Sequence, residues 1–221
     1  MSKVIEKEKA LDLFQDGQTI LFGGFLNAGS ANELLQYVAD NKELKDLTII
    51  GNDAHFGDRE GIASFTAKKY VKRVITSYIG SDRELGRQMN AGETEVVLVP
   101  QGTLAERIRA GGFGLGGVLT PTGVGLEEIE EGKEIIEVDG RKFLLEKPIV
   151  GDIAVINCAQ ADTYGNLVFT GMTRNFNELM AFAAPTVIVQ ADEVVEPGEL
   201  DPERISVPGA VVTHIVDGSK F

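Results

Sequence analysis

Short apolar runs rich in β-branched residues alternate along the chain with segments whose apolar residues recur at helical spacing. The first half has four such runs, which predict buried strands over 19–24, 47–51, 71–79 and 95–99. Helical spacing and turn residues predict a first helix that ends at Asp16-Gly17 and further helices over 32–40, 82–91 and 103–110. Strands and helices that alternate at this spacing indicate βαβ units on a mostly parallel sheet.

The second half of the chain has a different pattern. Two alternating runs meet at Asp139-Gly140, a dipeptide that suits a type I′ turn, so residues 133–146 predict a β-hairpin. Further apolar runs predict buried strands over 152–160, 186–190 and 210–216, with a helix over 175–183. Since no linker or internal repeat interrupts the chain, we expect a single domain over 1–221 of the α/β class. It has an open, mostly parallel sheet with flanking helices plus a β-rich subregion.

The charge balance excludes some classes of partner. The 221 residues carry 21 basic and 34 acidic side chains, a net charge of −13, which rules out a simple nucleic-acid or acidic-membrane binder. The deficit is uneven, because residues 1–110 hold 14 basic against 16 acidic side chains (−2), whereas residues 111–221 hold 7 against 18 (−11). Any anion-repelling face therefore lies in the second half.

The composition gives no support for metal, disulfide or membrane chemistry. Cys158 is the only cysteine, which excludes an internal disulfide and a multi-thiolate metal site, and its apolar surroundings predict a small buried side chain. His55 and His214 form no metal-binding spacing, so we expect structural roles for both. No apolar run approaches the ~18 residues of a membrane span, and the N-terminus does not have the pattern of a signal peptide, so we expect a soluble cytoplasmic protein.

A glycine-rich segment directly follows the first predicted strand. It consists of Gly23, Gly24, Phe25, Leu26, Asn27, Ala28, Gly29 and Ser30. Small residues let a ligand approach the backbone here, and the free N–H groups of the next helix attract an anion such as phosphate or carboxylate. The spacing differs from the dinucleotide fingerprint because Leu26 replaces the middle glycine. A plain strand-to-helix turn is the alternative interpretation.

Two amide side chains lie just past the ends of predicted strands. Asn52 follows the second strand, and Gln101 follows the fourth. Because ligands of open α/β sheets bind outside the carboxyl ends of the strands, Asn52 and Gln101 are candidates to face one crevice. An amide both donates and accepts hydrogen bonds, which suits holding a carbonyl or a developing oxyanion. The alternative is that both are turn or capping residues.

Three other clusters have more than one interpretation. The run from Gly111 to Gly117 is too rich in glycine for a helix or a stable strand. It predicts a mobile lid or a close-approach loop over a ligand, or else a flexible surface loop. The acidic run over 127–131 is most economically a solvated helical face. The basic cluster is either a solvated element end or a patch for phosphates or an acidic partner. Its members are Lys68, Lys69, Lys72 and Arg73.

Several sequence blocks together point to one family. They are DGQTILFGGFLNAG (16–29), SYIGSDRELGRQM (77–89), the long block over 96–125, ADTYGNL (161–167), RNFN (174–177) and VPGA (207–210). On these blocks the chain resembles the α subunit of the class I (3-oxoacid) coenzyme A-transferases, most closely the acetate/butyrate–acetoacetate type. One departure is Ala31, where the family's first signature has proline.

The resemblance implies a two-subunit enzyme. In the family a glutamate attacks an acyl-CoA thioester, an acyl anhydride and then a glutamyl-CoA thioester form, and an acceptor carboxylate takes the CoA in ping-pong order. The family places that glutamate in an S-E-N-G motif of the β subunit, and neither S-E-N nor E-N-G occurs in this chain. The resemblance therefore implies a β partner in an α2β2 assembly, no permanently bound cofactor, and coenzyme A thioesters and short-chain carboxylic acids as substrates.

The resemblance also assigns roles to the candidate residues. It places Gln101 and Asn52 near the reacting carbonyl, coenzyme A at residues 23–30, and residues 111–117 beside the site. The alternative function is a non-catalytic sensor of sugar phosphates or coenzyme A on a related α/β fold. The choice among acetate, butyrate and acetoacetate stays open, because a methylene or keto group changes binding by only about 1–3 kcal/mol.

Overall fold

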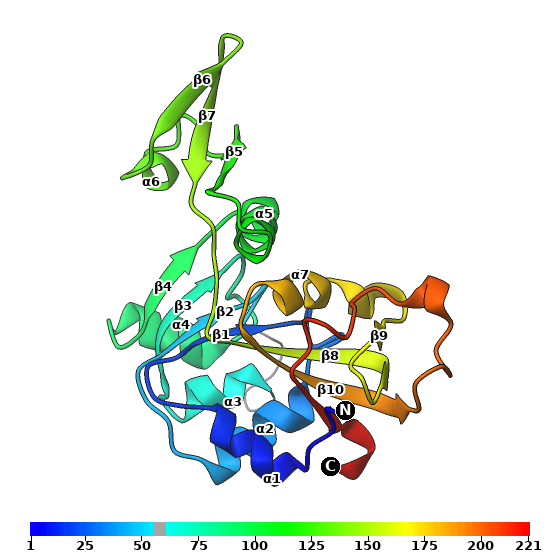
Figure 1. The fold of residues 1–221 in the computed structure, drawn as a ribbon. Coiled ribbons are helices and arrows are strands. Elements are labelled where there is room, and N and C mark those ends of the chain that lie inside the picture. The colour runs from blue at the N-terminus through cyan, green and yellow to red at the C-terminus, as the bar shows by residue number, and fades with distance from the viewer. Residues whose placement is uncertain (55–60) are drawn as a thin grey trace.

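An eight-stranded sheet runs through the body of the computed structural model, which describes residues 1–54 and 61–221 (Figure 1). The strands follow the order β11-β10-β8-β1-β2-β3-β4, with β9 paired to β8. Their bounds are β1 Thr19–Phe22, β2 Leu47–Ile50, β3 Val71–Thr76, β4 Glu95–Leu98, β8 Ile153–Asp162, β9 Leu167–Val168, β10 Thr186–Val195 and β11 His214–Asp217. Every pair is parallel except β8 with β9, which confirms the predicted mostly parallel sheet.

Helices cover both faces of this sheet (Figure 1). The α-helices are α1 Lys7–Ala10, α2 Asn32–Asn41, α3 Ile62–Ala67, α4 Arg83–Asn90, α5 Gln101–Gly112, α6 Glu127–Glu130 and α7 Asn177–Phe182. Short 3-10 turns are η1 Leu11–Leu13, η2 Gly171–Arg174, η3 Pro202–Arg204 and η4 Gly218–Lys220. Among the described residues, no helix combines the length and apolarity that a membrane span needs.

Two apolar cores lie on opposite sides of the sheet. In β1, Ile20 and Phe22 join the core under α2 and α3, whereas Leu21 joins the core under α5 and α7. Successive side chains of a strand point to opposite faces, so a strand between two cores needs apolar residues at every position. This double burial explains why the strands appear in the sequence as continuous apolar runs.

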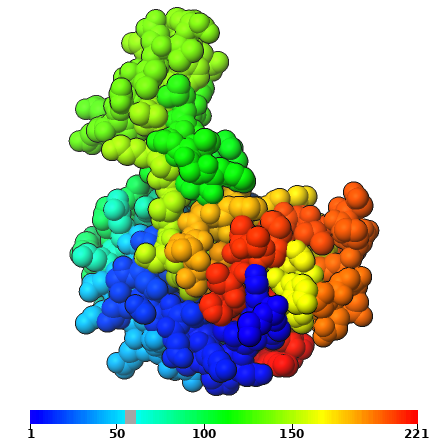
Figure 2. Space-filling view, in the orientation of Figure 1, coloured from blue at the N-terminus to red at the C-terminus, as the bar shows by residue number. Residues whose placement is uncertain are grey.

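A second sheet projects from the body as a separate lobe (Figures 1 and 2). Its strands are β5 Val118–Thr120, β6 Ile135–Val138 and β7 Arg141–Glu146, in the antiparallel order β5-β7-β6. Asp139 and Gly140 have φ values of 51° and 75°, as a type I′ turn requires, so the predicted hairpin is confirmed. The short strand β5 was not predicted.

Some boundaries differ from the sequence predictions. The predicted N-terminal helix is only the single turn α1 followed by η1. The strand expected from residue 210 begins at His214, because Val211 and Val212 donate their N–H groups to Pro208 and Gly209 in a pair of turns. The expected structural role of His55 lies outside the described residues.

The prediction that all of residues 111–117 lie outside a helix is wrong at its first two positions. Gly111 and Gly112 form the last turn of α5. A Cβ on Gly111 would lie 1.9 Å from the carbonyl oxygen of Ile149, and one on Gly112 would lie 2.8 Å from Cβ of Phe182. Glycine is needed here because two other segments contact the helix backbone. Close packing, which composition does not reveal, outweighs the poor helix propensity of glycine.

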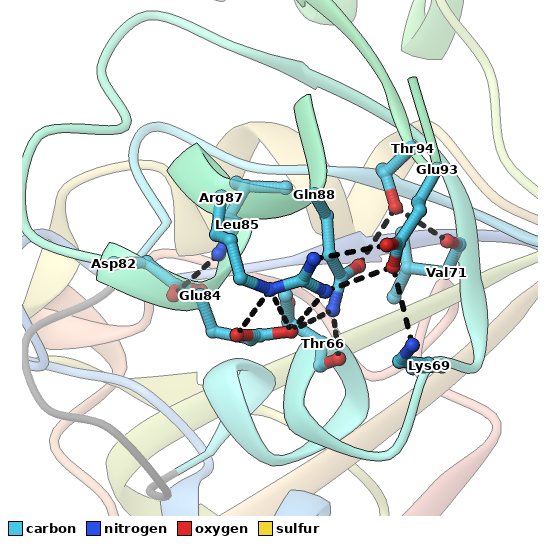
Figure 3. A network of polar contacts seen from close by, with 10 residues as sticks. All are labelled: Thr66, Lys69, Val71, Asp82, Glu84, Leu85, Arg87, Gln88, Glu93 and Thr94. Atoms are coloured by element: carbon cyan, nitrogen blue, oxygen red, sulfur yellow. Dashed lines mark hydrogen bonds and ion pairs between the residues drawn. The ribbon is translucent and has the colours of Figure 1, made fainter. Parts of the chain in front are cut away.

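A polar network holds α4 against the edge of the main sheet (Figure 3). The guanidinium of Arg87 lies between two carboxylates, 2.8 Å from Glu84 Oε1 and 2.8 Å from Glu93 Oε2. Gln88, which is buried, donates from Nε2 to the Thr66 carbonyl at 2.9 Å. The hydrogen bonds to Arg87 are the main cause that lowers the pKa of both Glu84 and Glu93 to about 2.

Candidate active site

The structure brings the two predicted amides together. Asn52 lies two residues after the end of β2, and Gln101, the first residue of α5, lies three residues after the end of β4. The Gln101 Nε2 group donates to Asn52 Oδ1 at 2.6 Å. Asn52 is buried with 2% exposure, whereas Gln101 is exposed. One amide is therefore fixed inside the protein, and it holds a second amide at the surface.

Asn52 is held from several sides. Its Nδ2 donates to Asp53 Oδ2 at 2.7 Å, and its backbone carbonyl accepts from the N–H of Ser77 at 3.0 Å and from the Ser77 hydroxyl at 2.5 Å. Ser77 follows β3, the strand between β2 and β4. These contacts fix the orientation of the Asn52 amide, and through it the orientation of Gln101.

Asp53 connects this amide pair to the glycine-rich segment. Its Oδ2, which accepts from Asn52, also accepts from the backbone N–H of Leu26 at 3.0 Å. Asp53 is buried with 2% exposure. The sequence analysis did not include Asp53 among the candidates. Like Asn52, Asp53 lies just past the end of a strand, and this position could have identified it.

The segment over 23–30 forms a tight turn. Phe25 and Ala28 exchange backbone hydrogen bonds of 3.1 and 2.9 Å, and Leu26 and Asn27 between them have φ values of 47° and 70°. This is the geometry of a type I′ turn. The side chain of Leu26 at its tip is 41% exposed.

Two asparagines from a distant part of the chain hold this turn. Asn175 accepts from the N–H of Gly24 at 3.1 Å and donates to the Ala28 carbonyl at 2.9 Å. Asn177 donates to the Gly29 carbonyl at 2.8 Å. A Cβ on Gly23 would lie 1.6 Å from Asn177 Oδ1, so only glycine fits against this side chain. Asn175 and Asn177 belong to the RNFN block, but their role in holding the turn was not predicted from sequence.

One N–H group at the start of the helix that follows the turn has a partner in the protein. The N–H of Leu34, in the first turn of α2, donates to Oε1 of the buried Gln190 at 2.9 Å. Within the turn itself, the N–H groups of Gly24, Phe25, Leu26 and Ala28 also have partners in the protein. These four N–H groups are therefore already used within the protein, whereas the tip of the turn at Leu26 is exposed.

A pocket of about 510 Å³ opens beside the start of α5. Pro100 and Gly102, the two neighbours of Gln101, line it together with Leu119 and Thr120 of β5. The loop that continues from Phe113 to Gly117 leads from the end of α5 to β5. The pocket thus lies where the body and the projecting sheet meet.

The other candidates have structural surroundings. Cys158 is fully buried in β8, and burial raises the pKa of its thiol well above the ordinary range, which confirms the expected small buried side chain. His214 lies in β11, its Nδ1 is 2.9 Å from the Thr213 hydroxyl, and burial lowers its pKa. The described residues contain no group of three metal-binding side chains.

The charged clusters are mostly paired or solvated. Lys68, Lys69 and Arg73 lie 2.9, 3.2 and 3.3 Å from Asp40, Glu93 and Glu95 respectively, which supports the interpretation of a solvated element end. The acidic run includes the one-turn helix α6, on which Glu127 and Glu128 are exposed.

Comparison with known proteins gives a consistent result. The family model described as "Coenzyme A transferase" matches residues 4–218. The acetate CoA-transferase subunit alpha of Escherichia coli K12 is 47% identical over 97% of this chain and 96% of its own length. The acetoacetyl-CoA:acetate/butyrate CoA transferase alpha subunit of Clostridium acetobutylicum is 46% identical over 97% of both chains.

The fold is also found in a larger solved protein. The acyl-CoA transferase of Escherichia coli O157:H7, crystallised as a thioester complex with CoA, matches with a TM-score of 0.83 at 22% identity. The match covers 97% of this chain and 47% of that one, so this chain spans about half of the length of the solved protein.

Proposed function

The chain belongs to the coenzyme A transferase family, and from that premise we propose that it is the α subunit of a two-subunit enzyme that moves CoA between a short-chain acyl-CoA and a carboxylic acid. The observation that carries this proposal is the hydrogen bond of 2.6 Å between Gln101 and Asn52. It holds a surface amide at the strand ends, in a chain that lacks an S-E-N-G glutamate.

Gln101 is the residue that contacts the reacting thioester. Its Nε2 carries two hydrogens, and one of them is used in the bond to Asn52 Oδ1. The other has no hydrogen-bond partner among the described residues, so it can donate to the thioester oxygen, on which negative charge develops when a nucleophile attacks the carbonyl carbon. A donor held in place before the reaction stabilises that charge without reorganisation.

Asn52 and Asp53 are positioning residues. Asn52 accepts from Gln101, and Asp53 accepts from both Asn52 and Leu26. The pair therefore sets the position of the donor relative to the turn at 23–30. In this proposal the turn contacts the CoA moiety through the exposed tip at Leu26, because several of its N–H groups already have partners in the protein.

The β subunit supplies the nucleophile. Its glutamate attacks the thioester carbonyl carbon and the C–S bond breaks. The CoA thiolate departs, and an acyl-glutamyl anhydride is formed on the enzyme. The thiolate then attacks the glutamyl carbonyl, which releases the donor acid as a carboxylate and leaves a glutamyl-CoA thioester. An acceptor carboxylate reverses these two steps, so one difficult exchange becomes several easier ones. The acid is of the acetate, butyrate or acetoacetate class, and the assembly is α2β2.

Reconstitution tests this function. The chain is purified alone and together with a β chain that carries the S-E-N-G glutamate, and acetoacetyl-CoA formation from acetoacetate and a short-chain acyl-CoA is measured. We expect turnover only when both chains are present, with CoA bound covalently to the β glutamate after incubation with the donor alone. Full activity of the single chain, or the same lack of activity with the β chain, would contradict the proposal.

A further inference from the structure

The projecting sheet has two unlike faces. Residues directly opposite each other on neighbouring antiparallel strands share a face. Leu119 of β5 lies opposite Leu145 of β7, and Ile136 of β6 lies opposite Phe143 of β7. Val138 lies two residues from Ile136 on the same strand and therefore points the same way. These five side chains form what we call the apolar face, and all of them are hydrocarbon.

The described part of the chain leaves the apolar face uncovered. Leu119 and Val138 are each 42% exposed, and Ile136, Phe143 and Leu145 are half-buried, so none of the five is fully buried. Arg141 stacks on this face, with its guanidinium carbon 5.3 Å from the centre of the Phe143 ring. Arg141 thus forms a polar margin at the tip of the hairpin.

The opposite face of the same sheet is covered at its centre, although Ile135 at its margin is 45% exposed. Leu144, which lies opposite Ile135 on this face, is fully buried. A Cβ on Gly123 would lie 2.4 Å from Ile129 of α6 and 3.3 Å from Leu144, so this segment packs closely over the strand. The segment of Gly123 and Ile129 therefore covers the centre of this face, and no described segment packs over the apolar face in the same way.

Exposed apolar side chains also concentrate around this sheet. Of the fifteen large apolar side chains that the described residues expose, seven fall within 113–150: Phe113, Leu115, Leu119, Leu126, Ile135, Val138 and Val150. Isolated surface residues of this kind need no explanation, but a contiguous apolar patch marks an interaction site.

We propose that the apolar face is a docking site for the β subunit, an inference that rests on the proposed function. The solved Escherichia coli transferase contains this fold in 47% of one chain, so the rest of that chain is about the size of a second subunit. The pocket beside Gln101 runs along the edge strand β5, where it is lined by Leu119 of the apolar face and by Val118 and Thr120, which point to the opposite face. A partner seated on this face lies next to the site that lacks a nucleophile.

The docking surface extends beyond the five residues. Stable interfaces bury about 800 Å² on each partner, which is more than five half-exposed side chains supply. Phe113 and Leu115, exposed by 58% and 45%, lie in the loop that leads from α5 into β5 and extend the surface toward the body. The partner accordingly presents an apolar patch that contacts both the hairpin and this loop.

A matched pair of variants tests the docking site. Leu119→Glu and Val138→Glu are combined in one chain, and Ile135→Glu, an exposed position on the opposite face of the same hairpin, is the control. Because Leu119, Val138 and Ile135 are all exposed by 42–45%, each variant chain is expected to keep the circular dichroism spectrum and Tm of the parent. Binding to the β chain is measured by calorimetry, and complex size by light scattering.

The outcomes separate the inference from the proposed function. We expect the double variant to raise the Kd for the β chain at least about tenfold and Ile135→Glu to leave it within about twofold, since a buried charge at an interface centre is strongly unfavourable. Equal binding by parent and double variant would overturn the docking site while leaving the function intact. Loss of α–α association alone would assign the face to a second copy instead. A parent chain that does not bind the β chain would overturn both.

Discussion

Around Asn52 the chain satisfies its own polar groups, whereas the sheet of β5, β6 and β7 leaves an apolar face uncovered. In the body, buried side chains such as Asp53 and Asn177 each have hydrogen-bond partners from distant segments. The projecting sheet is joined to α5 by a buried ion cluster, in which Glu146 lies 2.6 Å from Lys133 and 3.6 Å from Arg107. Around Asn52 the body thus pairs its buried polar groups within the described chain, whereas the projecting sheet offers an apolar face to another surface.

The largest effect that would test this contrast is expected at Gln101. In the assembled enzyme, Gln101→Ala removes the proposed oxyanion donor, and we expect turnover to fall about 10²- to 10³-fold. The Tm should stay close to that of the parent, because Gln101 is exposed. Steady-state kinetics with saturating donor and acceptor checks the first expectation, and thermal unfolding checks the second.

Gln15→Ala provides the control for this experiment, because Gln15 is also exposed and lies far from Gln101 in the chain. Gln101→Glu has nearly the same shape but no N–H, so it should be as inactive as Gln101→Ala. Near-normal turnover of Gln101→Ala would show that the surface amide does not stabilise the reacting oxygen.

A substitution at Glu146 should have a smaller effect, a loss of stability that is confined to the projecting sheet. Glu146→Gln keeps the shape of the side chain but leaves Arg107 and Lys133 without their shared carboxylate. Removing one partner of a fully buried pair costs about 3–5 kcal/mol. We expect Glu146→Gln to lower the free energy of unfolding of the projecting sheet by about 2–3 kcal/mol, because the two cations are 18% and 26% exposed and keep some contact with water.

Hydrogen exchange locates this effect. Exchange should accelerate in residues 118–146 and remain slow in β8, and Glu137→Gln, an exposed change on the same sheet, should alter neither. Uniform acceleration across β8 would mean that the projecting sheet and the body unfold as one unit, which would remove the contrast between them.

The strands of the body can be predicted from the sequence more completely than the projecting sheet. The body strands were predicted because burial on two faces requires apolar residues at every position, as in Ile20, Leu21 and Phe22. The strand β5 was missed, because its three residues follow a glycine run and pair only with β7. The two glycines at the end of α5 were misassigned because their helical state depends on contacts with Ile149 and Phe182.

The candidate site was predictable where chain order places residues at strand ends. The rule for open sheets put Asn52 and Gln101 at one edge, and the structure joins them by a hydrogen bond. Asn175 and Asn177 contact the turn at 23–30 across about 150 residues of sequence, and no local pattern reports such contacts. These contacts could therefore not be predicted from the sequence, and the roles of Gln101 and Asn52 in a reaction stay predictions.

The smallest effect is expected at the exposed network of Arg87, at the edge of the body (Figure 3). Hydrogen bonds to Arg87 lower the pKa of Glu84 and Glu93 from 4.5 to about 2. The folded protein therefore prefers both carboxylates charged, and their stabilising effect is full above pH 4.5 and is lost as the pH falls toward 2.

Arg87→Gln should lower the Tm at pH 7 by only about 2 °C, because exposed ion pairs contribute little. That difference in Tm should shrink between pH 4.5 and 2. Arg83→Gln is the control, because Arg83 is an exposed residue of the same helix and has no ion pair with the described residues, and it should show no such trend. A difference that persists at pH 2 would mean that Arg87 stabilises the body through packing of its side chain rather than through its charge.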